Sequence, residues 1–346
     1  SLRRVYQGAL ANLASVPPAR HDLLPNGYAF GSIQTTRGCP LNCHFCSVSA
    51  FNGRSYRYRP IEAVVEELHL IPERLVLVVD DNLIGTRPEH IARAKDLFRA
   101  IIAADLGKKW ICQTTINLGD DEELLDLARR AGCVGAFIGF ESLSEQGLAE
   151  LGKRFNILKG ADLRASVARI HRHGIAVVGS FIIGLDSDTP GVGRRIAEAA
   201  SRYGVDLLNP IFLTPLPGTR LWETMQTQGR IAANRFPDEW RYYTLSYPVA
   251  RYQNMSWQQL LAEMEDCWRT FYSPLRTAWR VLGSLRRWRS PLIMLVANLS
   301  YRRNYGSDRE HFDDLDLSRG RAWNGSDAKA ASEFDDNRES PLLPAW

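Results

Sequence analysis

Short apolar segments alternate with amphipathic segments from residue 32 to about residue 232. Six short segments are rich in apolar and β-branched residues, and several are nearly all apolar, as is typical of strands buried on both faces. They are residues 32–36, 74–80, 109–116, 134–140, 175–184 and 205–213. The intervening amphipathic stretches begin and end at common helix-boundary residues such as Pro, Asp and Gly. This alternation predicts parallel strands joined by right-handed crossovers.

Six β/α units in series predict an α/β fold, namely a partial (β/α)6 TIM-like barrel over residues 32–232. Residues 1–31 are predicted to be an N-terminal lead-in or linker. Residues 233–306 lose the alternation and are predicted to form an aromatic, mostly helical C-terminal extension. Residues 307–346 are acidic with few large apolar side chains, which predicts a disordered tail. In such a barrel, functional groups gather at the carboxyl ends of the strands.

The composition narrows the class of protein. A hydrophobic fraction of 45% indicates a chain with a substantial core, and a net charge of +4 is too small to predict a nucleic-acid partner. There is no run of 18 apolar residues and no signal-peptide pattern, so we expect a cytoplasmic protein without a spanning helix. Because the chain opens with Ser1 rather than Met, we expect a processed protein or a fragment of a longer one.

Residues 276–303 hold seven arginines and no acidic residue, together with Trp279, Trp288 and an apolar run too short to span a bilayer. The simplest interpretation is a helical pair packed on the barrel with its arginines outward. Contact with a membrane surface, which would make the protein peripheral to the membrane, and binding of RNA phosphates are the other interpretations.

The cysteines fall into two groups. Three of the six stand alone in apolar or helical contexts and are interpreted as buried core residues. The other three follow the first predicted strand with the spacing C-x3-C-x2-C and are Cys39, Cys43 and Cys46. A four-iron cluster normally takes four thiolates, so three leave one iron open for another ligand. A zinc site with His44 is the competing interpretation, but His44 adjoins Cys43, so the two side chains do not easily converge on one ion.

The loop TRGCPLNCHFCSV resembles the signature of the radical S-adenosylmethionine (SAM) superfamily, CxxxCxxC with an aromatic residue, here Phe45, before the last cysteine. The resemblance covers about residues 30–230. It implies that the three cysteines bind three irons of a 4Fe–4S cluster and that SAM chelates the fourth. A flavodoxin- or ferredoxin-type protein would supply one electron. The 5′-deoxyadenosyl radical released from SAM would then take a hydrogen atom from a substrate.

The resemblance also implies roles for polar residues at the strand ends. Asp81, preferred over Asp80, would meet the methionyl ammonium of SAM. Glu141 would bind the ribose hydroxyls or the amine. Lys153 and Arg154 would pair with the SAM carboxylate, although a solvated basic pair is an equal alternative.

Four further residues near the ends of the fifth and sixth predicted strands, together with Phe45 in the cysteine loop, complete the implied SAM site. Ile182 and Gly184 would lie against adenine, and Ser180 would reach the methionyl carboxylate or the ribose. Pro215 would set a rigid turn near the adenine edge, and Phe45 would neighbour the bound cofactor.

The segments RHDLLPNGYAFGSIQTTRGCP, VVDDN, GFES and LTPLPGT resemble the cobalamin-associated branch of the superfamily, which contains methylases and ring-forming enzymes. No cobalamin-binding domain or D-x-H-x-x-G motif occurs in this chain, so the use of cobalamin stays open. The expected function is hydrogen abstraction from a small or lipid-like metabolite, leading to methylation or ring formation. The alternatives are a cobalamin-independent radical SAM enzyme that modifies RNA or protein, and a non-catalytic metal-binding module.

Overall fold

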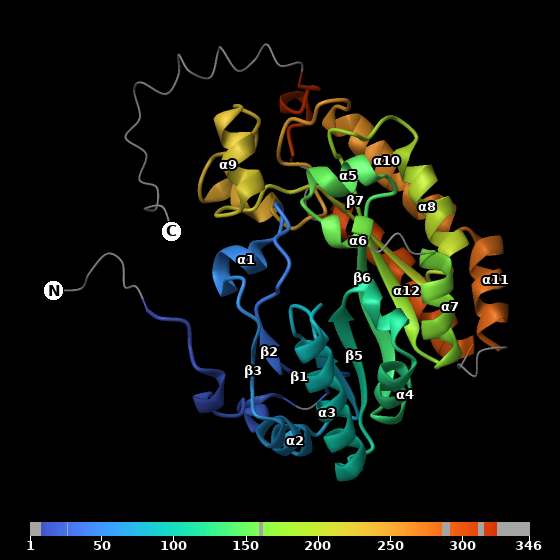
Figure 1. Cartoon of the computed structure of the whole chain (residues 1–346). Helices are drawn as coiled ribbons and strands as arrows, with labels where there is room; N and C mark the ends of the chain where they lie inside the picture. The colour runs from blue at the N-terminus through green and yellow to red at the C-terminus, as the bar shows by residue number, and fades with distance from the viewer. Residues whose placement is uncertain (1–7, 26, 159–161, 286–290, 311–314, 324–346) are drawn as a thin grey trace.

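Six parallel strands form one open sheet, in which each strand lies beside the next one along the chain (Figure 1). The computed structural model describes residues 8–25, 27–158, 162–285, 291–310 and 315–323. The strands are β1 (Gly31–Ile33), β4 (Leu75–Val78), β5 (Lys109–Thr114), β6 (Cys133–Glu141), β7 (Ala176–Ile183) and β8 (Leu207–Phe212). All five neighbouring pairs are parallel, and in the described residues β8 does not pair with β1. The predicted partial (β/α)6 architecture is confirmed, as an open sheet rather than a closed barrel.

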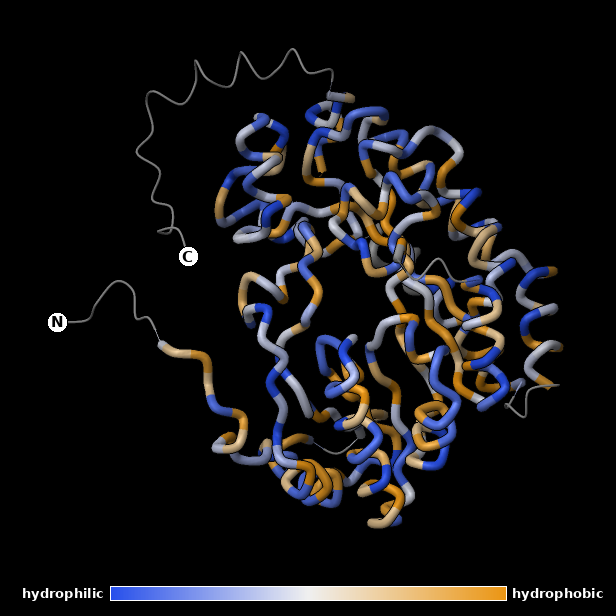
Figure 2. Tube along the Cα trace, viewed as in Figure 1, coloured by the Kyte–Doolittle hydropathy of each residue, from blue (hydrophilic) through white to orange (hydrophobic). Residues whose placement is uncertain are grey.

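Helices follow the strands along the chain, and the longer ones that connect consecutive strands cover the outer side of the sheet (Figure 1). They are α2 (Ile61–Leu70), α3 (Pro88–Ala104), α4 (Glu122–Arg130), α5 (Glu145–Glu150), α6 (Arg154–Leu158), α7 (Leu163–Arg172), α8 (Val192–Tyr203), α9 (Arg220–Thr227), α10 (Trp257–Phe271), α11 (Pro274–Leu285) and α12 (Pro291–Glu310). Their ends match local sequence signals: the Asp121 side chain accepts a hydrogen bond at the start of α4, and Ser256 and Gln259 form a capping box at the start of α10. Hydrophobic and hydrophilic residues alternate along these helices (Figure 2).

The two faces of the sheet differ sharply in burial. The row of aligned residues that faces the helices is buried throughout and comprises Ile33, Val78, Cys112, Ala136 and Val177. The adjacent row, Ser32, Leu77 and Ile111, points to the opposite face and is exposed or half-buried. The inner face of the partial barrel is therefore accessible in the described part of the chain, whereas the outer face forms the hydrophobic core.

The region after β8 closes over the carboxyl ends of the last two strands. The backbone N–H of Phe212 donates to Leu245 O at 2.9 Å, and the Tyr252 hydroxyl donates to Leu213 O at 2.7 Å. Residues 315–323, which lie within the predicted disordered tail, are ordered. Gly320 packs on the Trp257 ring, and the Gly320 carbonyl accepts from the backbone N–H of Trp257 at 2.8 Å. Residues 307–310 of that predicted tail belong to the end of a helix, and residues 311–314 and 324–346 lie outside the described residues.

Helices α11 and α12 pack on each other, and α12 also contacts β8. The prediction that the arginines of this pair point outward is wrong for α11. Arg276 donates to the Ser201 hydroxyl at 3.2 Å, and Arg280 donates to Asn298 Oδ1 at 2.8 and 3.0 Å. Both arginines are half-buried against the body of the protein, while Arg302 and Arg303 on α12 are exposed.

Candidate metal and SAM site

The loop with the three cysteines extends from a short antiparallel ribbon formed by β2 (Thr36–Arg37) and β3 (Arg57–Tyr58) and leads into α1 (Ser47–Asn52). Gly38 begins the loop with a φ of +89°, and a Cβ there would lie 2.1 Å from Ser55 O. A side chain is therefore excluded at this position. Farther along, the His44 N–H donates to Leu151 O at 2.8 Å, and the His44 carbonyl accepts from Leu221 N at 2.9 Å. These contacts fix the loop to the region of α5 and to α9.

The three thiols are half-buried, in contrast to the three other cysteines, which are fully buried as predicted. Burial raises the pKa of Cys43 to about 12, against a smaller opposing effect of the Lys153 ammonium, and burial raises the pKa of Cys39 and Cys46 as well. The thiols are thus neutral near pH 7 and would release protons when they bind iron.

The arrangement fits a cluster better than a single ion. Among the residues that the structure describes, no three His, Cys, Asp or Glu side chains converge on a position suited to one metal ion. A cuboidal cluster does not require such convergence, because each thiolate binds a different iron. His44, the nearest candidate for a fourth zinc ligand, instead donates from Nδ1 to Glu150 O at 3.1 Å. The donor set of three thiols fits a 4Fe–4S cluster in which one iron is left for another ligand.

The two adjacent aspartates after β4 have different environments. Asp80 is fully buried and accepts hydrogen bonds from Thr35 N, Thr35 Oγ1 and Thr36 Oγ1 at 2.5, 2.6 and 2.8 Å. Asp81 is half-buried, and its Oδ2 accepts from Gly38 N at 2.8 Å and Asn52 Nδ2 at 3.2 Å. Asp80 is therefore occupied in anchoring the residues that precede the loop, and Asp81 holds the first residue of the loop itself. Contact of Asp81 with SAM stays a prediction.

Asn82, whose role the sequence did not suggest, contacts the cysteine loop directly. Its Nδ2 lies 3.9 Å from Cys39 Sγ and 3.4 Å from Thr115 Oγ1. A chain of hydrogen bonds fixes the orientation of this amide: Asn117 Nδ2 donates to Gly85 O, and Asn117 Oδ1 accepts from Thr115 Oγ1, which leaves the Thr115 oxygen to accept from Asn82. The Asn82 amide therefore presents an N–H group to the Cys39 sulfur. The position of Asn82 two residues after the predicted strand 74–80 is the only signal in the sequence for this role.

Glu141 and Lys153 form a buried ion pair at the end of β6. Lys153 Nζ lies 2.5 Å from Glu141 Oε1 and donates to Gly139 O at 2.9 Å, and both side chains are less than 10% exposed. Burial acts to lower the pKa of Lys153, but the Glu141 carboxylate and the nearby Cys43 and Cys39 outweigh it, so the pKa is raised. The alternative that Lys153 is solvated is wrong. Arg154, by contrast, is exposed.

The backbone at Glu141 is unusual. Its φ of +67° lies in the left-handed region, and the pairing of β6 with β7 shifts between Gly139 and Glu141. A non-glycine residue in this region costs on the order of 1 kcal/mol and is common at functional sites. The shift turns the carboxylate back over Gly139, where a Cβ would lie 2.1 Å from Glu141 Oε1.

The remaining predicted residues lie along the same rim. Ser180 is aligned with Gly139 and Ile182 with Ile211, and both are buried. Gly184 has a φ of +103°, and a Cβ there would lie 3.0 Å from the Tyr252 ring, so glycine is favoured both by the backbone and by the close ring. Pro215 is buried after β8, and Phe45 is half-buried against the core. The structure brings Cys39, Cys43 and Cys46 close enough to Asp81 or Glu141 for their charges to act on the thiols. Every contact with SAM stays a prediction.

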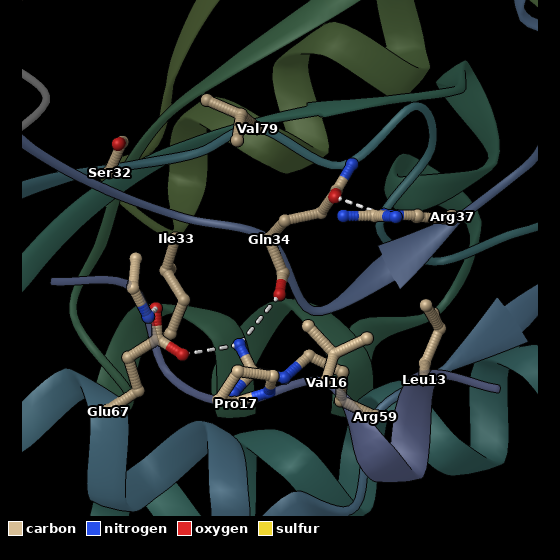
Figure 3. Close-up of a pocket in the computed structure, with 11 residues that line it drawn as sticks. Leu13, Val16, Pro17, Ser32, Ile33, Gln34, Arg37, Arg59, Glu67 and Val79 are labelled. Carbon is tan, nitrogen blue, oxygen red and sulfur yellow. Dashed lines mark hydrogen bonds and ion pairs between the residues drawn. The ribbon is translucent and has the colours of Figure 1, made fainter. Parts of the chain in front are cut away.

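A pocket of about 230 Å³ lies beside the start of the cysteine loop, between the lead-in and the edge strand β1. Figure 3 shows Gln34 at its centre, where Oε1 accepts from Arg37 Nε at 2.6 Å and the carbonyl accepts from Arg59 at 3.2 Å. Arg59 also pairs with the buried Glu67 at 2.6 Å. The lead-in lines the opposite wall through residues 13–19 and is thus packed against the sheet in this region.

Comparison with known proteins places this site in a family. The model of the radical SAM superfamily matches residues 33–209, which are more than half of the chain and include the three cysteines, Asp81 and Glu141. The chain belongs to the radical SAM superfamily. It is accordingly a radical SAM enzyme whose cofactors are a 4Fe–4S cluster and SAM, and the alternative of a non-catalytic metal-binding module is wrong.

Among its radical SAM relatives are two methylases. It is 30% identical to the hopanoid C-2 methylase of Rhodopseudomonas palustris over 71% of this chain and 45% of that protein. It is also 30% identical to the bacteriochlorophyllide d C-12(1)-methyltransferase of Chlorobaculum tepidum, over 74% of this chain and 54% of that protein. The chain thus spans about half the length of the curated relatives that it matches.

The fold resembles that of the radical SAM methyltransferase TsrM from Kitasatospora setae, solved with tryptophan substrate and a SAM analogue. The TM-score is 0.54 at 16% identity, and the match covers 82% of this chain and 62% of that chain. At this identity the likeness concerns the fold alone, and it supports the partial-barrel architecture.

Proposed function

We propose that this chain is the radical SAM portion of a methylase that acts on a small or lipid-like metabolite. The observation that carries the proposal is the placement of three thiols beside the buried Lys153–Glu141 pair at the carboxyl ends of parallel strands. The two methylase relatives support methylation as the outcome.

Individual residues of this chain would have distinct roles in binding the cluster and SAM. Cys39, Cys43 and Cys46 would hold three irons. When bound, the cluster and SAM supply an electron and a 5′-deoxyadenosyl radical that abstracts hydrogen from the substrate. The Lys153 ammonium would place a positive charge near the thiolates, and net charge around a cluster shifts its reduction potential. Asp81 would hold the loop through Gly38 while offering its second oxygen to the SAM ammonium.

Anaerobic reconstitution tests the proposal. The protein would be loaded with iron and sulfide, reduced in the presence of methyl-labelled SAM, and assayed for 5′-deoxyadenosine with and without added cobalamin. The expected result is a brown protein that forms 5′-deoxyadenosine. The triple variant Cys39→Ala, Cys43→Ala, Cys46→Ala should lose both properties, while Cys267→Ala, a fully buried cysteine in α10, should keep them.

Candidate substrates would then be offered to the loaded protein. Label found in a hopanoid- or tetrapyrrole-like acceptor would support the methylase proposal. A loaded cluster that yields no 5′-deoxyadenosine would overturn it. Formation of 5′-deoxyadenosine with a new ring and no label transfer would assign the chain to ring formation instead.

A further inference from the structure

Helix α11 presents its leucines to solvent and its polar residues to the protein. Four large apolar side chains lie at a helical spacing on the outer face and are 56–71% exposed: Leu275, Trp279, Leu282 and Leu285. On the opposite face, Thr277 and Ser284 are buried. This is the reverse of a surface helix of a soluble protein, whose apolar stripe faces the core.

Specific contacts hold this reversed orientation in place. The Arg280 guanidinium lies 3.9 Å from the centre of the Phe271 ring and donates two hydrogen bonds to Asn298 Oδ1. Asn298 is 1% exposed and its Nδ2 donates to Met294 O at 2.9 Å. Because a buried guanidinium is costly without partners, this network determines which face of α11 points outward.

The exposed apolar surface continues onto α12. Leu292, Val296 and Leu299 are 67%, 57% and 51% exposed. A groove of about 460 Å³ between the two helices, lined by residues such as Val281 and Leu295, adds to this surface. A contiguous apolar patch of this kind marks a site of contact with a membrane or another molecule.

We propose that the outer face of α11 and α12 docks on the surface of an anionic lipid bilayer. Residues 276–303 contain seven arginines and no acidic residue, and Arg302 and Arg303 are exposed beside the patch. Apolar side chains with Trp279 and flanking arginines are the features of helices that lie in the membrane interface. No helix in the described parts of the chain is long and apolar enough to cross a membrane, so the contact is peripheral.

Two other candidates for covering the outer face of α11 and α12 fit less well than a bilayer. A second copy related by twofold symmetry would bring the arginine-rich segment against itself, and residues 276–303 contain no acidic residue of their own to balance the charge. The described lead-in joins the sheet at β1, whereas α11 and α12 lie beside β8, at the other edge of the sheet (Figure 1). The lead-in therefore does not cover this face.

Co-sedimentation of the full chain with vesicles tests the proposal. Vesicles of phosphatidylcholine alone would be compared with a mixture of phosphatidylcholine and phosphatidylglycerol at about 0.1 M and about 1 M salt, between which the Debye length falls from about 10 Å to about 3 Å. We expect pelleting with the anionic vesicles that weakens at high salt. The double variant Trp279→Ser, Val296→Ser should lower the partition coefficient about tenfold or more. Arg302→Gln with Arg303→Gln should lower it about fivefold per arginine.

Leu23→Ser is the matched control, because Leu23 on the lead-in is as exposed as Trp279, at 69%. It should leave vesicle binding unchanged. Absence of pelleting with both kinds of vesicle would overturn the proposal, as would equal, salt-independent pelleting with neutral and anionic vesicles. A dimer in light scattering that Trp279→Ser dissociates, without vesicle binding, would assign the face to self-association. The outcome does not depend on cluster loading and so is separate from the test of the proposed function.

Discussion

The buried Lys153–Glu141 pair makes a quantitative prediction for stability. Lys153→Met keeps an unbranched side chain of similar length but removes the ammonium 2.5 Å from Glu141 Oε1. The carboxylate is 8% exposed and would lose its countercharge. Removing one partner of a buried ion pair typically costs about 3–5 kcal/mol, because the other charge stays buried without compensation. We expect a loss of this size in the free energy of unfolding.

Urea unfolding of the reduced, metal-free protein, followed by circular dichroism, measures the effect. Glu141→Gln should cost less, about 1–3 kcal/mol, because Lys153 keeps its bond to Gly139 O and gains an amide oxygen as a neighbour. The double variant Lys153→Met, Glu141→Gln should be more stable than the sum of the two single losses, since neither charge is left alone.

A loss below about 1 kcal/mol for Lys153→Met, with additive losses in the double variant, would refute the reasoning. It would mean that water reaches the pair from the inner face of the sheet, so that the interaction has the value of an exposed ion pair. Arg154→Met, which changes an exposed neighbouring cation, is the control and should change stability little.

Three further predictions concern the rim of the barrel. Asn82→Leu removes the N–H donor to Cys39, so the midpoint potential of the reconstituted cluster should become more negative by about 59 mV, a tenfold one-electron change. Redox titration with EPR detection measures this potential. An unchanged potential would contradict the hydrogen bond from Asn82 to the Cys39 sulfur. Asp188 follows β7 and is 9% exposed, and its Oδ2 accepts from the backbone N–H groups of Gly184 and Leu185 at 2.9 and 3.0 Å. Burial raises the pKa of this carboxyl from 3.8 to about 6, so the folded state binds the proton more tightly and the unfolding free energy should fall as the pH rises from 4 to 6. In urea unfolding, Asp188→Asn should reduce the fall in unfolding free energy between pH 4 and pH 6 by up to about 3 kcal/mol. An equal fall in both proteins would exclude Asp188 as the cause of the pH dependence. Gly38→Ala places a Cβ 2.1 Å from a backbone oxygen at positive φ, so iron content after reconstitution should fall; Gly8→Ala, which meets nothing within 4 Å, should have no effect.

The strands and helices were predictable because each is encoded locally. A nearly apolar run between helix-boundary residues describes a covered strand wherever it occurs, and all six such runs form the parallel sheet. The predicted first strand, residues 32–36, is the exception: it divides into β1 and β2. The reason is a contact that the local sequence cannot encode, since the Thr35 N–H donates to Asp80, which lies 45 residues away, rather than to a neighbouring strand.

The location of the candidate site was also predictable from the sequence, but the partners of its side chains were not. The cysteine spacing and the acids after the strands identified the rim, because chain order fixes which ends of parallel strands meet. The partners of these acids depend on side-chain directions instead. The sequence offered Asp80 and Asp81 as near equals, and only packing assigns one to Thr35 and the other to Gly38. Lys153 likewise becomes a site residue only because Glu141 turns toward it from a strained backbone.

The orientation of α11 is the feature that the charge pattern of the sequence predicted least well. Counting arginines favoured a helix with its cations outward, since solvation of a guanidinium is normally cheaper than burial. Arg280 does not follow that preference, because its guanidinium donates to the Asn298 amide oxygen on α12 and lies over the face of the Phe271 ring. Once these contacts fix the rotation of the helix, the leucines on the other side have no place in the core. Their exposure is thus a consequence of a polar contact, and whether a bilayer covers them is decided by the vesicle experiment rather than by composition.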